Sequence, residues 1–306
     1  MPTWEEDDAA IYAESLLCTF LQSLGGTQAL PVVLPMVETL LSNKNDWKQQ
    51  RAALSILEQC LFAAPVTFAQ YVPVAVETAL KLASTSDNLR VQFQAVVLLG
   101  ALCEADSALD GDIRGQYGAR ILQVFAQMVQ CKCSKIAAVA CLSLVSYCRG
   151  GGDVVNGATL VVPFLKEMLM ALVTGPLSWD VSESGAVAVK IRAIGAVACL
   201  AQSSEDAFCP FYSNVMPGLL GCTQLSSPSY EMSRLRGAAM EAATIVGQAV
   251  SASNRKYLSV VFYSWKAASL LIFFAPYLQA SCTWAMPRKL CTWQCQCFKL
   301  TTPLVQ

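Results

Sequence analysis

The chain contains no histidine in its 306 residues, and only 14% of its residues are charged. The absence of histidine excludes Ser-His-Asp and Cys-His catalysis and every zinc site that uses imidazole. The cysteines between Cys282 and Cys297 lack the paired C-x₂₋₄-C spacing of structural zinc. The net charge of −1 gives no strong basic field for nucleic acid. We therefore predict a protein that is not an enzyme, that holds no metal or cofactor, and that binds neither nucleic acid nor a small-molecule substrate.

The sequence also lacks an alternating strand pattern and a secretory leader. Apolar residues recur at helical spacing along nearly the whole chain, and the N-terminus, MPTWEEDDAA, is acidic and polar. Five of the fourteen cysteines lie inside apolar helical patterns, namely Cys60, Cys103, Cys141, Cys148 and Cys199. Cysteine behaves as a small hydrophobe in such positions. We expect reduced, buried thiols in a protein of the cytoplasm and nucleus.

Five segments can be aligned as the second helices of repeated helix pairs. They read WKQQRAALSILEQCL (47–61), LRVQFQAVVLLGALC (89–103), SKIAAVACLSLVSYC (134–148), VKIRAIGAVACLAQS (189–203) and SRLRGAAMEAATIVG (233–247). Each combines an early basic residue with an apolar face rich in small residues. The alignment steps are 43, 45, 53 and 44 residues. A first helix precedes each, at 34–41, 71–83, 117–129, 160–173 and 211–222, and four of these have a proline near the start (Pro35, Pro73, Pro163 and Pro217).

The period of this pattern predicts the fold. Two-helix units of about 40–47 residues are typical of HEAT and armadillo repeats, and such units stack into a superhelix with a concave binding surface. We predict an all-α protein, an α-solenoid of about five HEAT-type helix pairs. An acidic N-terminal segment with a first helix is expected at 1–25, the solenoid at 26–257, and an irregular, non-repeat tail at 258–306.

The stretch SRLRGAAMEAATIVGQAV (233–250) has unusually small side chains for a core helix. A helix held between neighbouring repeats needs slim sides, and we expect its glycines Gly237 and Gly247 to allow close approach of backbones. The predicted apolar stripe consists of Leu235, Ala238, Ala242, Ile245 and Ala249.

The last 49 residues differ from everything before them. Residues 258–306 hold four basic residues and no acidic one, share no repeat pattern and contain CTW twice. We interpret this tail as a translated intron or a shifted reading frame. Sequencing of the transcript tests this hypothesis.

Two segments resemble a known family. SLGGTQALPVVLPMVETLLSNKNDWKQQRAALSILEQC (23–60) has the order LGG, VLP and DWK of a middle segment of the importin-β (karyopherin) superfamily. FCPFYSNVMPGLLGC and SRLRGAAMEAATIVGQAV (208–250) are similar to later repeats of the same importins. The resemblance covers about residues 1–257 and favours the Ran-binding protein 5-like branch, which carries ribosomal proteins and histones.

This resemblance implies a segment of a nuclear transport receptor. Such a receptor binds cargo on the concave face of its HEAT-repeat superhelix, and Ran-GTP releases the cargo. The implied partners are basic proteins such as ribosomal proteins and histones, Ran-GTP, and nucleoporins. A HEAT-repeat scaffold for a phosphatase or a chromosome-associated complex is the alternative function.

The candidate partner-binding residues come from charge and position. The acidic run Glu5, Glu6, Asp7 and Asp8 could attract basic cargo or Ran over long range. On or beside the second helices lie Trp47, Arg51, Glu58, Arg90, Glu104, Arg234 and Glu241. The acidic members suit a lysine-rich segment. The arginines could instead form ion pairs between repeats, with Asp46 and Asp87 as acceptors.

Overall fold

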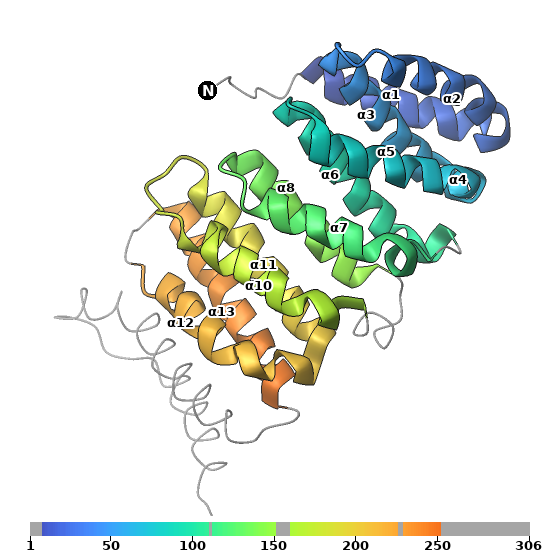
Figure 1. Cartoon of the computed structure of the whole chain (residues 1–306). Helices are drawn as coiled ribbons and strands as arrows, with labels where there is room; N and C mark the ends of the chain where they lie inside the picture. Colours follow the sequence, from blue (N-terminus) through green and yellow to red (C-terminus); the bar gives the residue numbers. More distant parts are fainter. Residues whose placement is uncertain (1–7, 110–111, 151–159, 226–228, 252–306) are drawn as a thin grey trace, which may run out of the picture. The chain divides into compact units, whose positions relative to one another are not determined.

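A computed structural model describes residues 8–109, 112–150, 160–225 and 229–251 (Figure 1). All of them belong to Met1–Val261, the first of the two units into which the chain divides. The acidic residues Glu5, Glu6 and Asp7 and the tail at 258–306 lie outside the described residues. The predictions made for them therefore stay predictions.

Five helix pairs follow one another along the described chain (Figure 1). The first helices are α2 (Gly26–Ser42), α5 (Val72–Thr85), α7 (Ile113–Val129), α10 (Leu165–Thr174) and α12 (Tyr212–Thr223). The second helices are α3 (Trp47–Ala63), α6 (Leu89–Glu104), α8 (Ser134–Arg149), α11 (Ala186–Ser204) and α13 (Tyr230–Ser251). Short turns of helix join them, including α4 (Pro65–Phe68), η2 (Asp106–Leu109) and η5 (Glu205–Phe211). The predicted all-α fold is confirmed.

Side-chain caps fix the start of several helices. The Asp46 carboxylate accepts hydrogen bonds from the backbone N–H groups of Lys48 and Gln49 at the start of α3. The Asn88 side chain accepts one from Arg90 N–H at the start of α6. Such caps satisfy N–H groups that have no partner within the helix. Asp46 is therefore occupied as a helix cap, and the expectation that it pairs with a repeat arginine finds no support.

Two of the four prolines do not lie where the sequence predicts. Pro73 is in the first turn of α5, and Pro163 opens a short 3₁₀ turn before α10, as expected. Pro35 lies inside α2, because that helix begins at Gly26 rather than near residue 34. Pro217 likewise lies inside α12. Each removes a backbone donor from the helix interior, so their host helices are held by packing rather than by intrinsic propensity.

The second helices form a continuous row. In this row α3 packs against α6, α6 against α8, α8 against α11, and α11 against α13. Helix α1 (Asp8–Leu24) packs against the free side of α3 and so extends the row by one member. Each first helix packs on the second helix of its own pair (Figure 1). A second helix therefore has neighbours on three sides, which explains its small residues.

The core is one contiguous apolar cluster that runs through the pairs. Cys60, Cys103, Cys141, Cys148 and Cys199 are buried in it as free thiols, as the sequence predicts. Burial raises the pKa of Cys60 to about 11 and that of Cys148 to about 12. One described stretch, Ala186–Thr223, is long and apolar enough to cross a membrane, but 61% of its most apolar window is buried in the protein. Packing in the solenoid core accounts for that composition.

Helix α13, which is rich in small side chains, is buried along a stripe that differs slightly from the predicted one. Leu235 and Ala242 are buried as expected, whereas Ala238, Ile245 and Ala249 are only partly buried. The other buried positions are Met232, Ala239, Ala243, Val246, Gly247 and Val250. A methyl group added at Gly237 would meet nothing within 4 Å, so the predicted close approach at that glycine is wrong. The true close approach is at Gly100 on α6.

Alanine substitution should therefore have opposite effects at the two glycines. A Cβ at Gly100 would lie 2.5 Å from Ser143 Oγ and 3.1 Å from Ser143 Cα on α8. We expect Gly100→Ala to lower the free energy of unfolding by about 1–3 kcal/mol through overpacking. Gly237→Ala should raise it by about 0.5–1 kcal/mol, because alanine costs less helix entropy. Urea denaturation of both variants checks this, and a stabilised Gly100→Ala protein would contradict the packing described for α6 and α8.

Candidate partner-binding surface

Three glutamates link consecutive second helices by the same kind of hydrogen bond. Ser55 on α3 donates its hydroxyl to Glu14 on α1, with an oxygen–oxygen distance of 2.6 Å. Gln94 on α6 donates its amide to Glu58 on α3 at 2.6 Å. Ser146 on α8 donates its hydroxyl to Glu104 on α6 at 3.1 Å. We call Glu14, Glu58 and Glu104 the carboxylate row.

The carboxylate row offers negative charge that a cation can bind. Its donors in these three bonds, two hydroxyls and one amide, are neutral, so the hydrogen bonds orient the carboxylates without neutralising them. Glu14 and Glu58 are half-buried, and Glu104 is exposed. Burial, reinforced by the nearby charge of Glu14, raises the pKa of Glu58 to about 7, although the hydrogen bond from Gln94 acts in the opposite direction. A cation placed beside this pair would relieve the repulsion between the carboxylates.

An aromatic and cationic cluster lies at the other end of the same helices. The Arg90 guanidinium of α6 is 5.1 Å from the centre of the Trp47 ring on α3, and the Lys48 ammonium is 5.9 Å from it. Both distances are within the range of cation–π attraction. Trp47 is half-buried and packs against the core. The predicted contact between repeats through Arg90 thus uses an aromatic ring.

Helical spacing places the Trp47 ring of this cluster and the carboxylate of Glu58 on one face of α3. Trp47, Arg51 and Glu58 are separated by four and seven residues, which at 100° per residue keeps them within about 40° of one another. Trp47 and Glu58 are about 16 Å apart along the helix axis, given a rise of 1.5 Å per residue. Helix α3 therefore presents aromatic, cationic and anionic groups on a single stripe.

The remaining predicted residues lie elsewhere. Arg234 and Glu241 are exposed on α13, which the helices α8 and α11 separate from α6 in the row. The Arg234 guanidinium lies 6.0 Å from the ring centre of the exposed Tyr230. Asp8 is the first residue of α1, and the rest of the acidic N-terminal run is outside the described residues. The structure therefore joins Glu58 and Glu104 in one row and keeps Arg234 and Glu241 apart from it.

Sequence reasoning missed the first member of the carboxylate row and all of its donors. Glu14 precedes Glu58 by 44 residues, and Glu58 precedes Glu104 by 46. The first step is within one residue of the 43-residue step of the alignment, so the period could have identified Glu14. Glu104 lies three residues beyond Ala101, the position that aligns with Glu58, and it belongs to the row through its hydrogen bond with Ser146. Glu14 was overlooked because residues 1–25 were set apart from the solenoid, whereas α1 packs on α3 as a member of the second-helix row. Ser55, Gln94 and Ser146 carry no pattern that marks them as donors.

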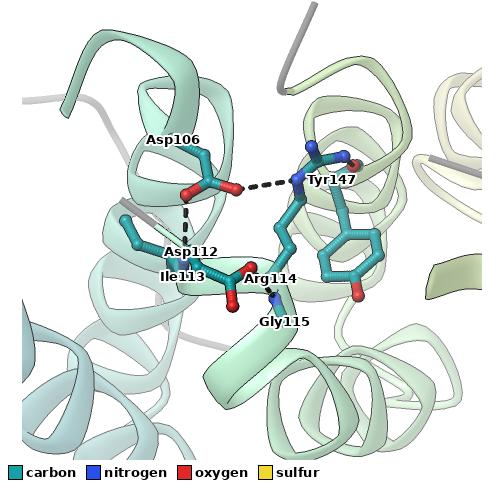
Figure 2. Close-up of polar contacts among 6 residues, drawn as sticks. All are labelled: Asp106, Asp112, Ile113, Arg114, Gly115 and Tyr147. Carbon is teal, nitrogen blue, oxygen red and sulfur yellow. Dashed lines mark hydrogen bonds and ion pairs between the residues drawn. The ribbon is translucent and has the colours of Figure 1, made fainter. Parts of the chain in front are cut away.

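A buried ion pair begins two residues after Glu104, at Asp106 (Figure 2). The Arg114 guanidinium of α7 donates to Asp106 at 2.9 Å and to the backbone carbonyl of Tyr147 on α8 at 3.2 Å. Asp106 also accepts a hydrogen bond of 2.8 Å from Ile113 N–H. Both charged residues are at most 5% exposed. Both carboxylate oxygens of Asp106 and two nitrogens of the Arg114 guanidinium are thus bonded to partners within the protein, which identifies a structural junction.

The other polar features of the described chain are less organised. An open cleft between α5 and α7 is lined by Lys81, Arg120 and Gln123, among others, and the exposed ion pair of Arg120 with Glu77 lies beside it. Among the described residues, no group of three or more potential metal ligands comes together. The carboxylate row is consequently the most regular polar surface, and we take it, together with Trp47, Arg51 and Arg90, as the candidate site.

Comparison with known proteins finds similarity at the level of structure. No protein-family model matches the sequence, and no curated protein matches it. The chain is similar to the crystal structure of Kap121p bound to Nup53p, with 18% sequence identity and a TM-score of 0.73 over 90% of this chain and 25% of that one. It is also similar to the karyopherin Kap121p bound to the extreme C-terminus of the protein phosphatase Cdc14p, at 19% identity and a TM-score of 0.74 over 91% of this chain and 25% of that one.

A third structure, Kap121p bound to Ste12p, gives 18% identity and a TM-score of 0.68 over 91% of this chain and 27% of that one. The chain thus spans about a quarter of the length of the solved structures that it matches. These TM-scores establish the fold, and activity and partners remain to be argued from the site. The described helices have the fold of the karyopherin Kap121p, an α-solenoid of HEAT-type repeats.

Proposed function

We propose that this chain is a segment of a nuclear transport receptor of the importin-β superfamily, and that its carboxylate row binds a basic segment of cargo. The observation that carries the proposal is the row itself, in which Glu14, Glu58 and Glu104 recur on consecutive second helices of a karyopherin fold. The family resemblance makes the second-helix row the concave, cargo-facing side. A solenoid of the scaffold type would share the fold, but the likeness to Kap121p favours transport.

The spacing of the row suggests the form of the bound segment. Packed helices lie about 8–10 Å apart, so Glu14 on α1 and Glu58 on α3 are offset by about that distance. Glu104 lies ten residues beyond Gln94, the partner of Glu58 on α6, and is therefore about 15 Å farther along that helix, or about two further steps of the bound segment. A polyproline II segment rises about 3.1 Å per residue with three residues per turn. Residues i, i+3 and i+6 of such a segment lie on one side, at steps of about 9 Å. We therefore expect a cargo segment with a lysine at every third position to fit the row.

Trp47 and Arg51 would complete the site at the opposite end of α3. The Trp47 ring, already flanked by Arg90, offers an aromatic surface for the apolar stem of a lysine or for an aromatic cargo residue. Arg51 is half-buried on the same stripe and would donate hydrogen bonds to a cargo carboxylate or backbone carbonyl. A segment in which basic residues alternate with apolar or acidic ones would use both ends.

The finer parts of the proposal come from the family resemblance. They are import of basic proteins such as ribosomal proteins and histones, release by Ran-GTP, passage through nucleoporins, and exchange between cytoplasm and nucleus. Structures of Kap121p bound to Nup53p and to the SUMO protease Ulp1p support a karyopherin-type solenoid as a binding module. The Ran-binding protein 5-like branch remains our assignment from sequence.

Fluorescence anisotropy with a labelled peptide tests the proposal. The probe carries lysine at every third position, and the control peptide has glutamine at those positions. We expect micromolar binding of the lysine peptide that weakens steeply between 50 and 300 mM salt, as roughly expected for partly exposed charge pairs. Equal affinity for the two peptides would contradict cargo binding through the row. Addition of Ran-GTP then asks separately whether release occurs.

A further inference from the structure

Helices α6 and α8 are joined more closely than side-chain packing alone requires. The Ser143 hydroxyl of α8 donates to the Val96 carbonyl of α6 at 3.0 Å. Gly100 of α6 lies where a methyl group would collide with Ser143, and a Cβ at Gly150, just beyond α8, would collide with the Cys103 carbonyl. The two backbones therefore approach closely along the C-terminal halves of the two helices.

The buried ion pair fixes the end of this interface at which Glu104 lies. Glu104 is the last residue of α6, and Asp106 follows two residues later. Ser146, the hydrogen-bond donor to Glu104, is adjacent to Tyr147, whose carbonyl accepts from Arg114. Arg114 thus connects the chain just after Glu104 with the chain just after Ser146. Figure 2 shows Arg114 between Asp106 and Tyr147, which lie two residues after Glu104 and one residue after Ser146.

We propose that Arg114 is a positioning residue for the binding surface. By bridging Asp106 and the Tyr147 carbonyl, it holds the end of α6 against the end of α8, and so keeps the Glu104 carboxylate in place beside Ser146. This inference rests on the proposed function of the carboxylate row. Arg114 itself is buried and touches no partner; it acts through the backbone on either side of the Glu104–Ser146 hydrogen bond.

The guanidinium is required for this role because only a planar fork reaches two acceptors at once. Its Nε donates to Asp106 while Nη1 donates to Tyr147 O. Lysine would keep the positive charge beside Asp106 but offers a single ammonium, which cannot reproduce the fork. Arg114→Lys therefore removes the bridge between Asp106 and Tyr147 but keeps the positive charge beside Asp106. Arg120→Lys is the matched control, since Arg120 is also on α7 but makes an exposed ion pair with Glu77 on α5.

A double-mutant cycle on peptide binding tests the proposal. With the lysine peptide described above, Arg114→Lys should weaken binding about three- to tenfold, and Arg120→Lys should leave it within about twofold. In the Glu104→Gln background, Arg114→Lys should cause no further loss, whereas in the Glu58→Gln background it should cause its full loss. An equal loss in both backgrounds, or no loss in the wild type, would overturn the positioning role.

Hydrogen exchange of the free protein keeps the inference testable if the peptide does not bind. Arg114→Lys should speed exchange of the last-turn amides of α8 by about tenfold or more, and Arg120→Lys should not. Unchanged exchange in Arg114→Lys would overturn the inference regardless of the ligand. Absence of peptide binding to the wild-type protein would instead count against the proposed function. Ser146→Ala, which leaves the buried pair intact, should weaken peptide binding without changing the exchange of these amides by more than about twofold.

Discussion

Replacing Arg114 by methionine should lower the free energy of unfolding by about 3–5 kcal/mol, the loss typical when one partner of a buried ion pair is removed. The substitution leaves Asp106 only 4% exposed with its charge uncompensated. It also leaves the Tyr147 carbonyl, near the C-terminal end of α8, without the donor that satisfies it. Methionine fills most of the arginine volume, so loss of packing contributes little.

Urea denaturation followed by circular dichroism measures this change. Arg120→Met is the matched control, because its ion pair with Glu77 has both side chains at least half exposed. Exposed pairs contribute little, and we expect a loss below about 1 kcal/mol for the control. The double variant Arg114→Met with Asp106→Leu should recover part of the stability by removing the stranded charge. Similar losses for Arg114→Met and Arg120→Met would contradict the buried junction.

Glu58→Gln should change how stability depends on pH. The pKa of Glu58 is about 7 in the folded protein, against an ordinary value of 4.5. The folded state therefore holds this proton more tightly than the unfolded state does. The stability contributed by the protonated group is complete below about pH 4.5 and is lost as the pH rises through 7. The loss for the wild-type protein is on the order of 2–3 kcal/mol.

The glutamine variant has no such proton to lose. At pH 8 we expect Glu58→Gln to be more stable than the wild type by about 2–3 kcal/mol, and at pH 4.5 we expect near equality. Glu38→Gln, at an exposed glutamate of the first helix α2, is the control and should stay within about 0.5 kcal/mol at both pH values. Thermal and urea unfolding across pH 4.5–8.5 provide the measurement. A Glu58→Gln protein that is less stable than the wild type at pH 8 would show that Glu58 has a compensating cation.

The repeat period was readable from the sequence because it depends on apolar residues that recur along the chain. Cys60, Cys103 and Cys148 are buried at equivalent places in α3, α6 and α8, as the alignment predicts. Helix starts were less predictable. Pro35 suggests a start near residue 34, but the packing of Ala29 and Leu30 into the core extends α2 back to Gly26.

Polar positions were harder to predict, because their partners are far apart in sequence. Arg114 resembles an exposed loop residue before the predicted helix at 117–129, yet its partners are Asp106 and the carbonyl of Tyr147, 33 residues away. The sequence marks Glu58 by its charge and by its place on a second helix. Its raised pKa depends on Glu14 and Gln94, which belong to neighbouring helices. Such contacts follow from the stacking of repeats and have no local signature.

The packing around the glycines of α6 and α13 also depends on the neighbouring repeat. Both are mid-helix glycines in second helices, and sequence alone favours Gly237 as a point of close approach. The structure assigns that role to Gly100, which faces Ser143, whereas Gly237 has open space around the position of its missing side chain. The neighbouring repeat decides the role of each glycine, and its position cannot be read from the helix itself.

The central claim is that the carboxylate row on the second helices binds basic cargo segments. The most direct measurement is the affinity for the lysine peptide of two triple variants with equal charge change. One replaces Glu14, Glu58 and Glu104 of the row by lysine, and the other replaces the exposed Glu38, Glu77 and Glu167 of the first helices. We predict a loss of about 100-fold or more for the first variant, equivalent to about 3 kcal/mol, and less than about threefold for the second. Equal losses in the two variants, or retained binding in the first, would contradict the claim.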